Sequence, residues 1–402
     1  MNKTNINHKF LFLLTLILLL AIPFPARAVE LSQVSGELTD AANGPLIAVI
    51  LPLSGPFVEY GEILKKGYEQ GFSDTTGTTA PQCRVKYLDS QANPETARNL
   101  INLLSSEGEV AIATGTPLNA TAWTVSRACE KNSLPYLIVG ADQDNLINKK
   151  SVSTFRLTPK HSALKQMLTR FIAAQEPDIK SMGIIYDNSI CATKKARKLR
   201  ALCAAKNIDL SIWKQWQTYS NNRDNFYDLL NVVKERQPEI LFLVANPTLT
   251  NRLWQQGHRL EITPEATIAI PTGTITTTPE VAAAAGKQNS PASRLIYAAP
   301  WVNPGNNLAD GENVSTADNP LAAAGSAAAA VIINCLKKSL NLTAEEISKS
   351  MEATRIDTVY GTVDFTTEQS GHQNPAPWYL CRNNENGQTE VVFPAPEKNE
   401  AK

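Results

Sequence analysis

Strand-like and helix-like segments alternate with regular spacing along most of this chain. Residues 46–51 are apolar at every position, which is typical of a strand covered on both faces by helices. After it, Tyr60, Leu64, Tyr68 and Phe72 recur every four residues and predict one face of a helix. An alternation of this kind favours an α/β fold built on parallel sheets.

The next helix has clear ends in the sequence. Asn93 is a natural N-cap, Pro94 suits the first helical position and Gly108 is a natural stop. Further strands are expected at residues 83–89, 110–114, 135–139, 181–187, 208–213, 239–244 and 266–270. One sheet holding all of these strands would be very long, so the pattern favours two lobes.

The N-terminus has the pattern of an export signal. Lys3 and Lys9 precede an apolar run from Phe10 to Pro23, and Ala26-Arg27-Ala28 matches a signal-peptidase site. The run is too short to span a bilayer. We therefore expect a signal peptide over residues 1–28, cleaved after Ala28, and a periplasmic mature protein, with an uncleaved anchor as the alternative.

The charge balance of the mature chain excludes some partners. Without its first 28 residues, the 402-residue chain keeps 374 residues, with 35 Lys and Arg against 38 Asp and Glu. This length suits two ordinary domains. Because the sequence has neither a basic patch nor a basic tail, we expect no nucleic-acid or anionic-membrane partner.

The six cysteines suggest disulfides in an exported protein. Cys83, on a predicted strand, and Cys129, on a predicted helix of the same lobe, are the first candidate pair. Buried thiols are the alternative. Cys191 and Cys203 lie at the start and near the end of one predicted helix, so they cannot bridge while that helix is intact. No CxxC is present, which argues against a zinc ribbon or a redox motif.

Searches for catalytic motifs find none. The sequence has no GxSxG elbow, no Gly-rich loop ending in Gly-Lys-Ser/Thr and no HExxH. The three histidines of the mature chain, His161, His258 and His372, have no Cys, His or carboxylate at ligand spacing. The sequence therefore predicts a protein that is not an enzyme and that has no cofactor or metal.

The turns after the strands are the best candidates for a binding site. Ligands of parallel α/β sheets bind beyond the carboxyl ends of the strands, where loops lead into helices. Here these turns read SGPFVEYG, TGTPLNATA and GADQDN. Asn119 and Thr121 could cap a helix whose first N–H groups remain available to a carboxylate. A purely structural capping role is the alternative.

Six segments in this order resemble the branched-chain amino-acid-binding proteins of ABC importers. They are IAVILPLSGPFVEYGEILKKGYEQG, VKYLDSQANPETARNLINLL, TGTPLNATAWTVSRACEKNSLPYLIVGAD, TFRLTPKHSALKQ, MGIIYDNSICATKKARKLRALCAAKNIDL and YGTVDFT. The resemblance implies an α/β fold of two Rossmann-like lobes with parallel-sheet cores, joined by three hinge segments: the type I periplasmic-binding-protein fold.

The same resemblance implies a division of the chain and a function. The first lobe would hold residues 45–156 and 300–357, and the second lobe 158–298 and 360–394, with a polar tail at 395–402. A monomer of this kind would capture a small organic ligand between its lobes by hinge closure and deliver it to an ABC permease in the inner membrane. An envelope sensor or protein-partner module on the same fold is the alternative.

The resemblance also implies which residues contact the ligand. They are Tyr60, Asn119, Ala120, Thr121, Ala141, Asp142, Asn246 and Thr272. Cys191 occupies a position where the family has an aromatic residue. Thr272 stands where amino-acid binders commonly carry an acid for the ligand ammonium, so a small carboxylate or apolar ligand is expected instead. The alternative is that Asp142 takes the acid's role.

Overall fold

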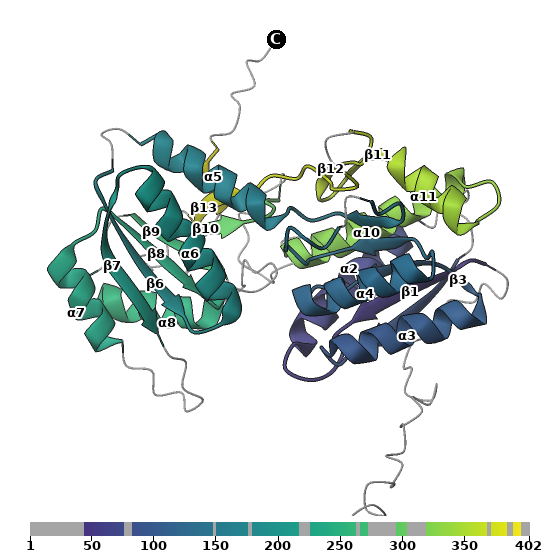
Figure 1. The fold of residues 1–402 in the computed structure, drawn as a ribbon, viewed down its shortest axis with the longest axis horizontal. Helices are drawn as coiled ribbons and strands as arrows, with labels where there is room; N and C mark the ends of the chain where they lie inside the picture. The colour runs from purple at the N-terminus through teal and green to yellow at the C-terminus, as the bar shows by residue number, and fades with distance from the viewer. Residues whose placement is uncertain are drawn as a thin grey trace, which may run out of the picture. The chain divides into compact units, whose positions relative to one another are not determined.

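The computed structural model describes residues 44–75, 83–147, 150–175, 179–216, 226–262, 266–271, 295–303, 319–367, 371–383 and 389–394. The signal peptide expected over residues 1–28, the ligand contact expected at Thr272 and the polar tail expected at 395–402 lie outside the described residues. Figure 1 shows the helices and strands with their labels.

The first sheet is parallel throughout its described strands, in the order β2-β1-β3-β4-β5. Its strands are β1 (Leu46–Leu51), β2 (Arg84–Asp89), β3 (Val110–Gly115), β4 (Tyr136–Ile138) and β5 (Thr154–Arg156). Helices α2 (Val58–Thr75) and α10 (Pro320–Lys338) pack on one face, and α3 (Pro94–Glu107) and α4 (Asn119–Lys131) lie on the other (Figure 1). Every residue of β1 is buried, as a strand covered on both faces requires.

The second sheet has the order β14-β13-β10-β9-β8-β6-β7. Its strands are β6 (Ser181–Asp187), β7 (Asp209–Trp216), β8 (Ile240–Ala245), β9 (Ala266–Pro271), β10 (Ile296–Ala299), β13 (Tyr379–Asn383) and β14 (Thr389–Phe393). The strands β6 to β10 are parallel, whereas β13 and β14 form a terminal hairpin and are antiparallel to their neighbours.

Helices cover both faces of the second sheet as well. One apolar cluster joins α5 (His161–Ala173) and α6 (Ile190–Ala205) to the sheet, and a second cluster joins α7 (Tyr227–Arg236) and α8 (Pro247–Arg259) to it (Figure 1). The α/β architecture with two parallel-sheet cores is therefore confirmed.

The local signals for helix ends are also confirmed where the chain is described. The Asn93 side chain accepts hydrogen bonds from the N–H groups of Glu95 and Thr96, which satisfies two of the unpaired donors at the start of α3. Gly108 has φ 71°, a left-handed conformation that glycine adopts at no steric cost, and it ends the helix.

Helix α10 is the most apolar helix of the first sheet's core. By length and composition alone it is, among the described residues, the one helix that could cross a membrane. Most of it is buried inside the protein, however, against α2 and the sheet. Its apolar sequence is thus accounted for by its place in the core.

The C-terminal part of the chain places one boundary between the lobes later than expected. Residues 360–394 were assigned together to the second lobe, but Tyr360, Val363 and Phe365 pack in the core of the first sheet. The short hairpin β11 (Arg355–Thr358) and β12 (Gly361–Asp364) follows α11 (Ala344–Glu352), which was not predicted. The boundary lies later because these apolar side chains find their partners on the first sheet.

The segment that follows this hairpin also lies against the first sheet. The Arg156 N–H at the end of β5 donates to the His372 carbonyl, and the Asn374 N–H donates to the Arg156 carbonyl. The ring of His372 stacks on Phe155 with centroids 4.2 Å apart. Along this C-terminal segment, Trp378 is the first residue that packs in the core of the second sheet.

The expected disulfide between Cys83 and Cys129 is wrong. No disulfide joins any of the six cysteines, all of which are described. Cys83 packs against the core on the α2 and α10 side of the first sheet, whereas Cys129 is buried on α4, on the other side. A bond between them would have to pass through the sheet. Cys191 and Cys203 lie on the single helix α6, as predicted.

Candidate functional site

The start of helix α4 is tied to the loop that follows β4. The Asn119 Oδ1 accepts hydrogen bonds from the N–H groups of Asp142 (2.9 Å) and Gln143 (3.0 Å), and its Nδ2 donates to Asp142 Oδ1 (2.9 Å). The expectation that Asn119 caps the helix is wrong, because α4 begins at Asn119 and Leu118 precedes it without a side-chain cap. Asn119 instead fixes Asp142 beside the helix start.

Thr121 is the most informative residue at this helix start. Its side chain is buried, and its Oγ1 has no hydrogen-bond partner within the described chain. A buried hydroxyl without a hydrogen-bond partner lowers stability unless a ligand or water forms that hydrogen bond. It lies in the first turn of α4, whose first N–H groups have no intrahelical acceptors. This end of the helix can therefore receive an anionic or acceptor group.

The turn that leads into α4 needs a glycine at Gly115. Its φ is 102°, and a Cβ there would lie 2.5 Å from the Ile50 carbonyl oxygen. The turn therefore passes directly over the end of the neighbouring strand β1. The following Thr116 side chain hydrogen-bonds with the Tyr136 hydroxyl, which anchors the turn in the core.

Asp142 is buried and holds an ion pair. Its Oδ2 lies 3.4 Å from Lys195 Nζ, and the two side chains are 8% and 4% exposed. Burial tends to raise the pKa of Asp142, but Lys195, the Asn119 amide and His161 together bring the pKa below its usual value. The carboxyl group is therefore ionised at neutral pH, with Lys195 as its main counter-ion.

His161 begins helix α5 beside this pair. The backbone N–H of His161 donates to the Asp142 carbonyl (2.7 Å), and the imidazole Nδ1 lies 3.9 Å from Asp142 Oδ2. Burial and the nearby Lys195 lower the pKa of His161 to about 4. The imidazole is thus neutral at neutral pH, which leaves one carboxylate and one ammonium in this group.

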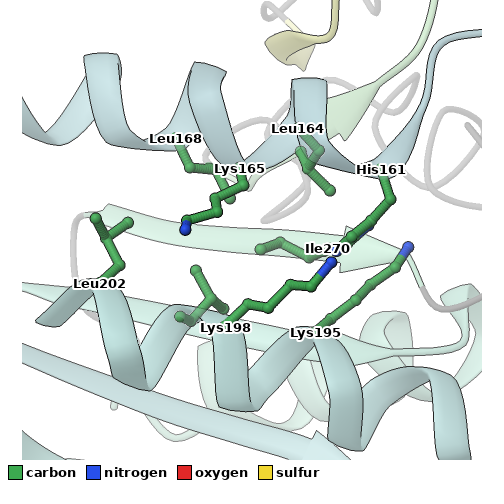
Figure 2. A pocket seen from close by; sticks show the side chains of 9 residues that line it. His161, Leu164, Lys165, Leu168, Lys195, Lys198, Leu202 and Ile270 are labelled. Atoms are coloured by element: carbon green, nitrogen blue, oxygen red, sulfur yellow. The ribbon is translucent and has the colours of Figure 1, made fainter. Parts of the chain in front are cut away.

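A pocket of about 300 Å³, part of it open to solvent, lies between α5 and α6. Figure 2 shows its lining, in which His161 and Lys195 reach the same end and Leu164 and Ile270 supply part of the apolar wall. None of the described residues that were predicted to contact ligand lines it. It is a separate feature of the α5–α6 layer.

The remaining predicted residues have local roles in the structure. Tyr60 lies in the first turn of α2, packs against the first core and has its ring centroid 6.0 Å from that of Phe57. Asn246 precedes α8, where its Oδ1 accepts the Leu249 N–H (2.9 Å) and its own N–H donates to Asp187 Oδ2 (3.1 Å). Ala141 is buried beside Asp142.

Sequence reasoning missed two residues that organise this region. Asp187, at the end of β6, also accepts the Ser189 N–H (2.8 Å) and so joins the loops after β6 and β8. Lys195 pairs with Asp142. The spacing of apolar residues along α6 could have revealed Lys195. It lies in a basic stretch, but it shares the buried face of the helix with Ala192, Ala196 and Leu199.

Comparison with known proteins gives the family. The family model described as "Periplasmic binding protein" matches residues 46–388. This chain belongs to the periplasmic binding protein family. No curated protein matches the sequence.

Solved structures of periplasmic binding proteins share the fold at low sequence identity. An amino acid ABC transporter substrate-binding protein from Pseudomonas fluorescens has a TM-score of 0.69 at 15% identity, over 88% of this chain and 95% of its own. The branched-chain amino acid transporter substrate-binding protein of Streptococcus pneumoniae in complex with isoleucine has a TM-score of 0.66 at 16% identity (87% and 99%). A solute-binding protein of R. palustris in complex with benzoate has a TM-score of 0.67 at 14% identity (87% and 96%).

These findings confirm the predicted family and the type I periplasmic-binding fold with two lobes. Periplasmic binding proteins are located in the periplasm and bind solutes for transporters rather than catalyse reactions.

Proposed function

We propose that this protein captures a small carboxylate with an apolar body and delivers it to an ABC permease of the inner membrane. The observation that carries the proposal is the buried Thr121 hydroxyl, unpartnered among the described residues, at the start of α4. A ligand carboxylate would accept hydrogen bonds from the Thr121 O–H and from the backbone N–H groups of the first turn that have no intrahelical acceptor.

Apolar side chains beside this helix start support an apolar ligand body. Phe57 precedes α2, Val58 begins it and Trp123 lies near the start of α4. All three are exposed, and the two helices follow the neighbouring strands β1 and β3. Isoleucine and benzoate, the ligands of two structural neighbours, both join a carboxylate to an apolar body. The comparisons give no support to the envelope-sensor alternative.

Closure of two lobes is the proposed capture step. We propose lobes of residues 45–156 with 300–374, and 158–298 with 378–394, which moves the expected boundary to follow the packing of Tyr360, Phe365 and Asn374. A ligand that contacts both lobes favours the closed form, and the permease would recognise that form. Small-angle scattering that finds the same dimensions with and without ligand would count against this step.

Replacement of Thr121 tests the carboxylate site. Thr121→Val keeps the shape and removes the hydroxyl, so affinity for a carboxylate should fall about 10-fold. The measurement is calorimetry with benzoate, 4-methylpentanoate and any ligand that native mass spectrometry finds on protein purified from its own periplasm.

Thr124→Val is the matched control. Thr124 lies on the same helix, but its Oγ1 donates to the Ala120 carbonyl (3.0 Å), so its loss should leave affinity unchanged. Equal losses for the two variants would show that Thr121 does not contact the ligand. A wild-type protein that binds no small molecule would overturn the proposed function itself.

Export of the protein is proposed to remove residues 1–28. The apolar run and the Ala26-Arg27-Ala28 site support cleavage after Ala28. N-terminal sequencing of the exported protein is expected to begin at Val29. A periplasmic protein that retains its first residues would contradict this assignment and favour the anchor.

A further inference from the structure

Lys195 is a buried lysine that reaches out of its own helix. Its Nζ donates to the Pro271 carbonyl at the end of β9 (2.8 Å) and lies 3.4 Å from Asp142 Oδ2. Because burying an ammonium without partners is costly, these two oxygens hold the side chain in place. Figure 2 shows Lys195 extended toward the end of the pocket where His161 lies.

Its partner Asp142 is equally constrained. Asn119 holds both its carboxylate and its N–H, and the N–H of His161 donates to its carbonyl. Through Asn119, the Asp142 carboxylate adjoins the start of α4, where the proposed ligand carboxylate binds. Any ammonium on the carbon next to that carboxylate would therefore enter the region of Asp142.

Two other described acids of these loops, Asp144 and Asp187, already have partners. Asp144 pairs with Lys198 (3.6 Å), and Asp187 accepts two backbone N–H groups. With neutral His161, Asp142 has Lys195 as its ion-pair partner, and the buried Arg156 also interacts with its charge. An incoming ammonium would lose its hydration, meet Lys195 as a like charge and find Asp142 already paired.

We propose that Lys195 is a specificity-determining residue: its side chain pairs with Asp142, the acid that would otherwise bind a ligand ammonium, so the ligand is a carboxylate without an α-ammonium group. This inference rests on the proposed function, since it concerns the same site. It identifies the substrate class as simple apolar carboxylic acids rather than amino acids.

A matched pair of ligands tests the selectivity. L-Leucine and 4-methylpentanoate share one carbon skeleton and differ in the α-ammonium. Calorimetry on the wild-type protein should show at least a roughly 100-fold preference for 4-methylpentanoate. In Lys195→Met, which frees Asp142 while keeping an apolar side chain, the preference should fall below about 10-fold. The double variant with Asp142→Asn should regain the wild-type preference. Wild-type protein that binds leucine as tightly as 4-methylpentanoate would overturn the inference.

A second arm needs no natural ligand. Lys195→Ala removes a fragment equivalent to n-propylammonium and leaves Asp142 unpaired, so thermal stability should fall. Added n-propylammonium chloride should restore it saturably, whereas sodium chloride at equal ionic strength should not. The rescue should disappear in Lys195→Ala with Asp142→Asn.

The two arms separate the inference from the proposed function. If the wild-type protein binds neither 4-methylpentanoate nor leucine, the proposed ligand class fails, and the rescue alone decides the role of Lys195. Rescue that requires Asp142 supports a filled ammonium subsite. A Lys195→Ala protein that n-propylammonium leaves unchanged, or a double variant that it rescues equally, contradicts that role.

Discussion

Replacing Gly67 by alanine is expected to destabilise the protein by about 3 kcal/mol or more, although alanine is the better helix former. The reason is the contact between α2 and α10. A Cβ at Gly67 would lie 2.1 Å from the Ala322 carbonyl oxygen, and one at Gly71 would lie 2.5 Å from that of Ser326. Gly325 on α10 makes the reciprocal approach to Leu64. The two backbones touch, so an added methyl group must separate the helices.

Urea unfolding of Gly67→Ala measures this effect. Lys66→Ala is the matched control, because Lys66 is exposed in the same turn of α2 and its replacement should change the free energy of unfolding by less than about 0.5 kcal/mol. A Gly67→Ala protein as stable as the control would mean that the two helices can separate at no cost, which would contradict their backbone contact.

Replacing Arg156 by methionine is expected to cost about 3 kcal/mol of the free energy of unfolding. The Arg156 side chain is 1% exposed. Its Nε donates to Gln373 Oε1 and its Nη1 to the Gln143 carbonyl (2.5 Å). Burial lowers its pKa to about 10, well above neutral pH, so the guanidinium stays charged. Methionine would fill part of the space but leave these oxygens without their donor.

Hydrogen exchange should locate the Arg156 effect. The N–H of Asn374 bonds to the Arg156 carbonyl, and the Gln373 side chain also donates to the Thr158 carbonyl (3.0 Å). We expect residues 372–374 to exchange faster in Arg156→Met. Arg98→Met removes an exposed arginine that pairs with Glu95, and should have little effect. Equal unfolding free energies for the two variants would contradict the structural role of Arg156.

Much of the fold could be predicted from the sequence, because local signals there agree with the long-range packing. The apolar run of β1 requires cover on both faces, and Asn93, Pro94 and Gly108 define α3 by backbone chemistry alone. The strand β10 and the helix α11 were not predicted. Their short sequences become regular through neighbours that are distant in the chain.

The site was less predictable, because it depends on pairs that only the fold brings together. The sequence marked the start of α4 and the loop after β4, but it assigned Asn119 to capping rather than to Asp142. Lys195 has the same charge as its exposed neighbours Lys194 and Lys198, so only its place on the buried face of α6 sets it apart. The Cys83 and Cys129 pairing failed because a lobe assignment does not say which face of the sheet a residue occupies.

The close fit of α2 to α10 also bears on how the chain acquires its structure during synthesis. Helix α2 leaves the ribosome early, but its partner follows only after the whole second sheet up to β10. Until then the part of this face that α10 covers has no partner, because local contacts cannot replace one so distant in sequence. We therefore expect the first sheet to complete its folding only after α10 has been synthesised.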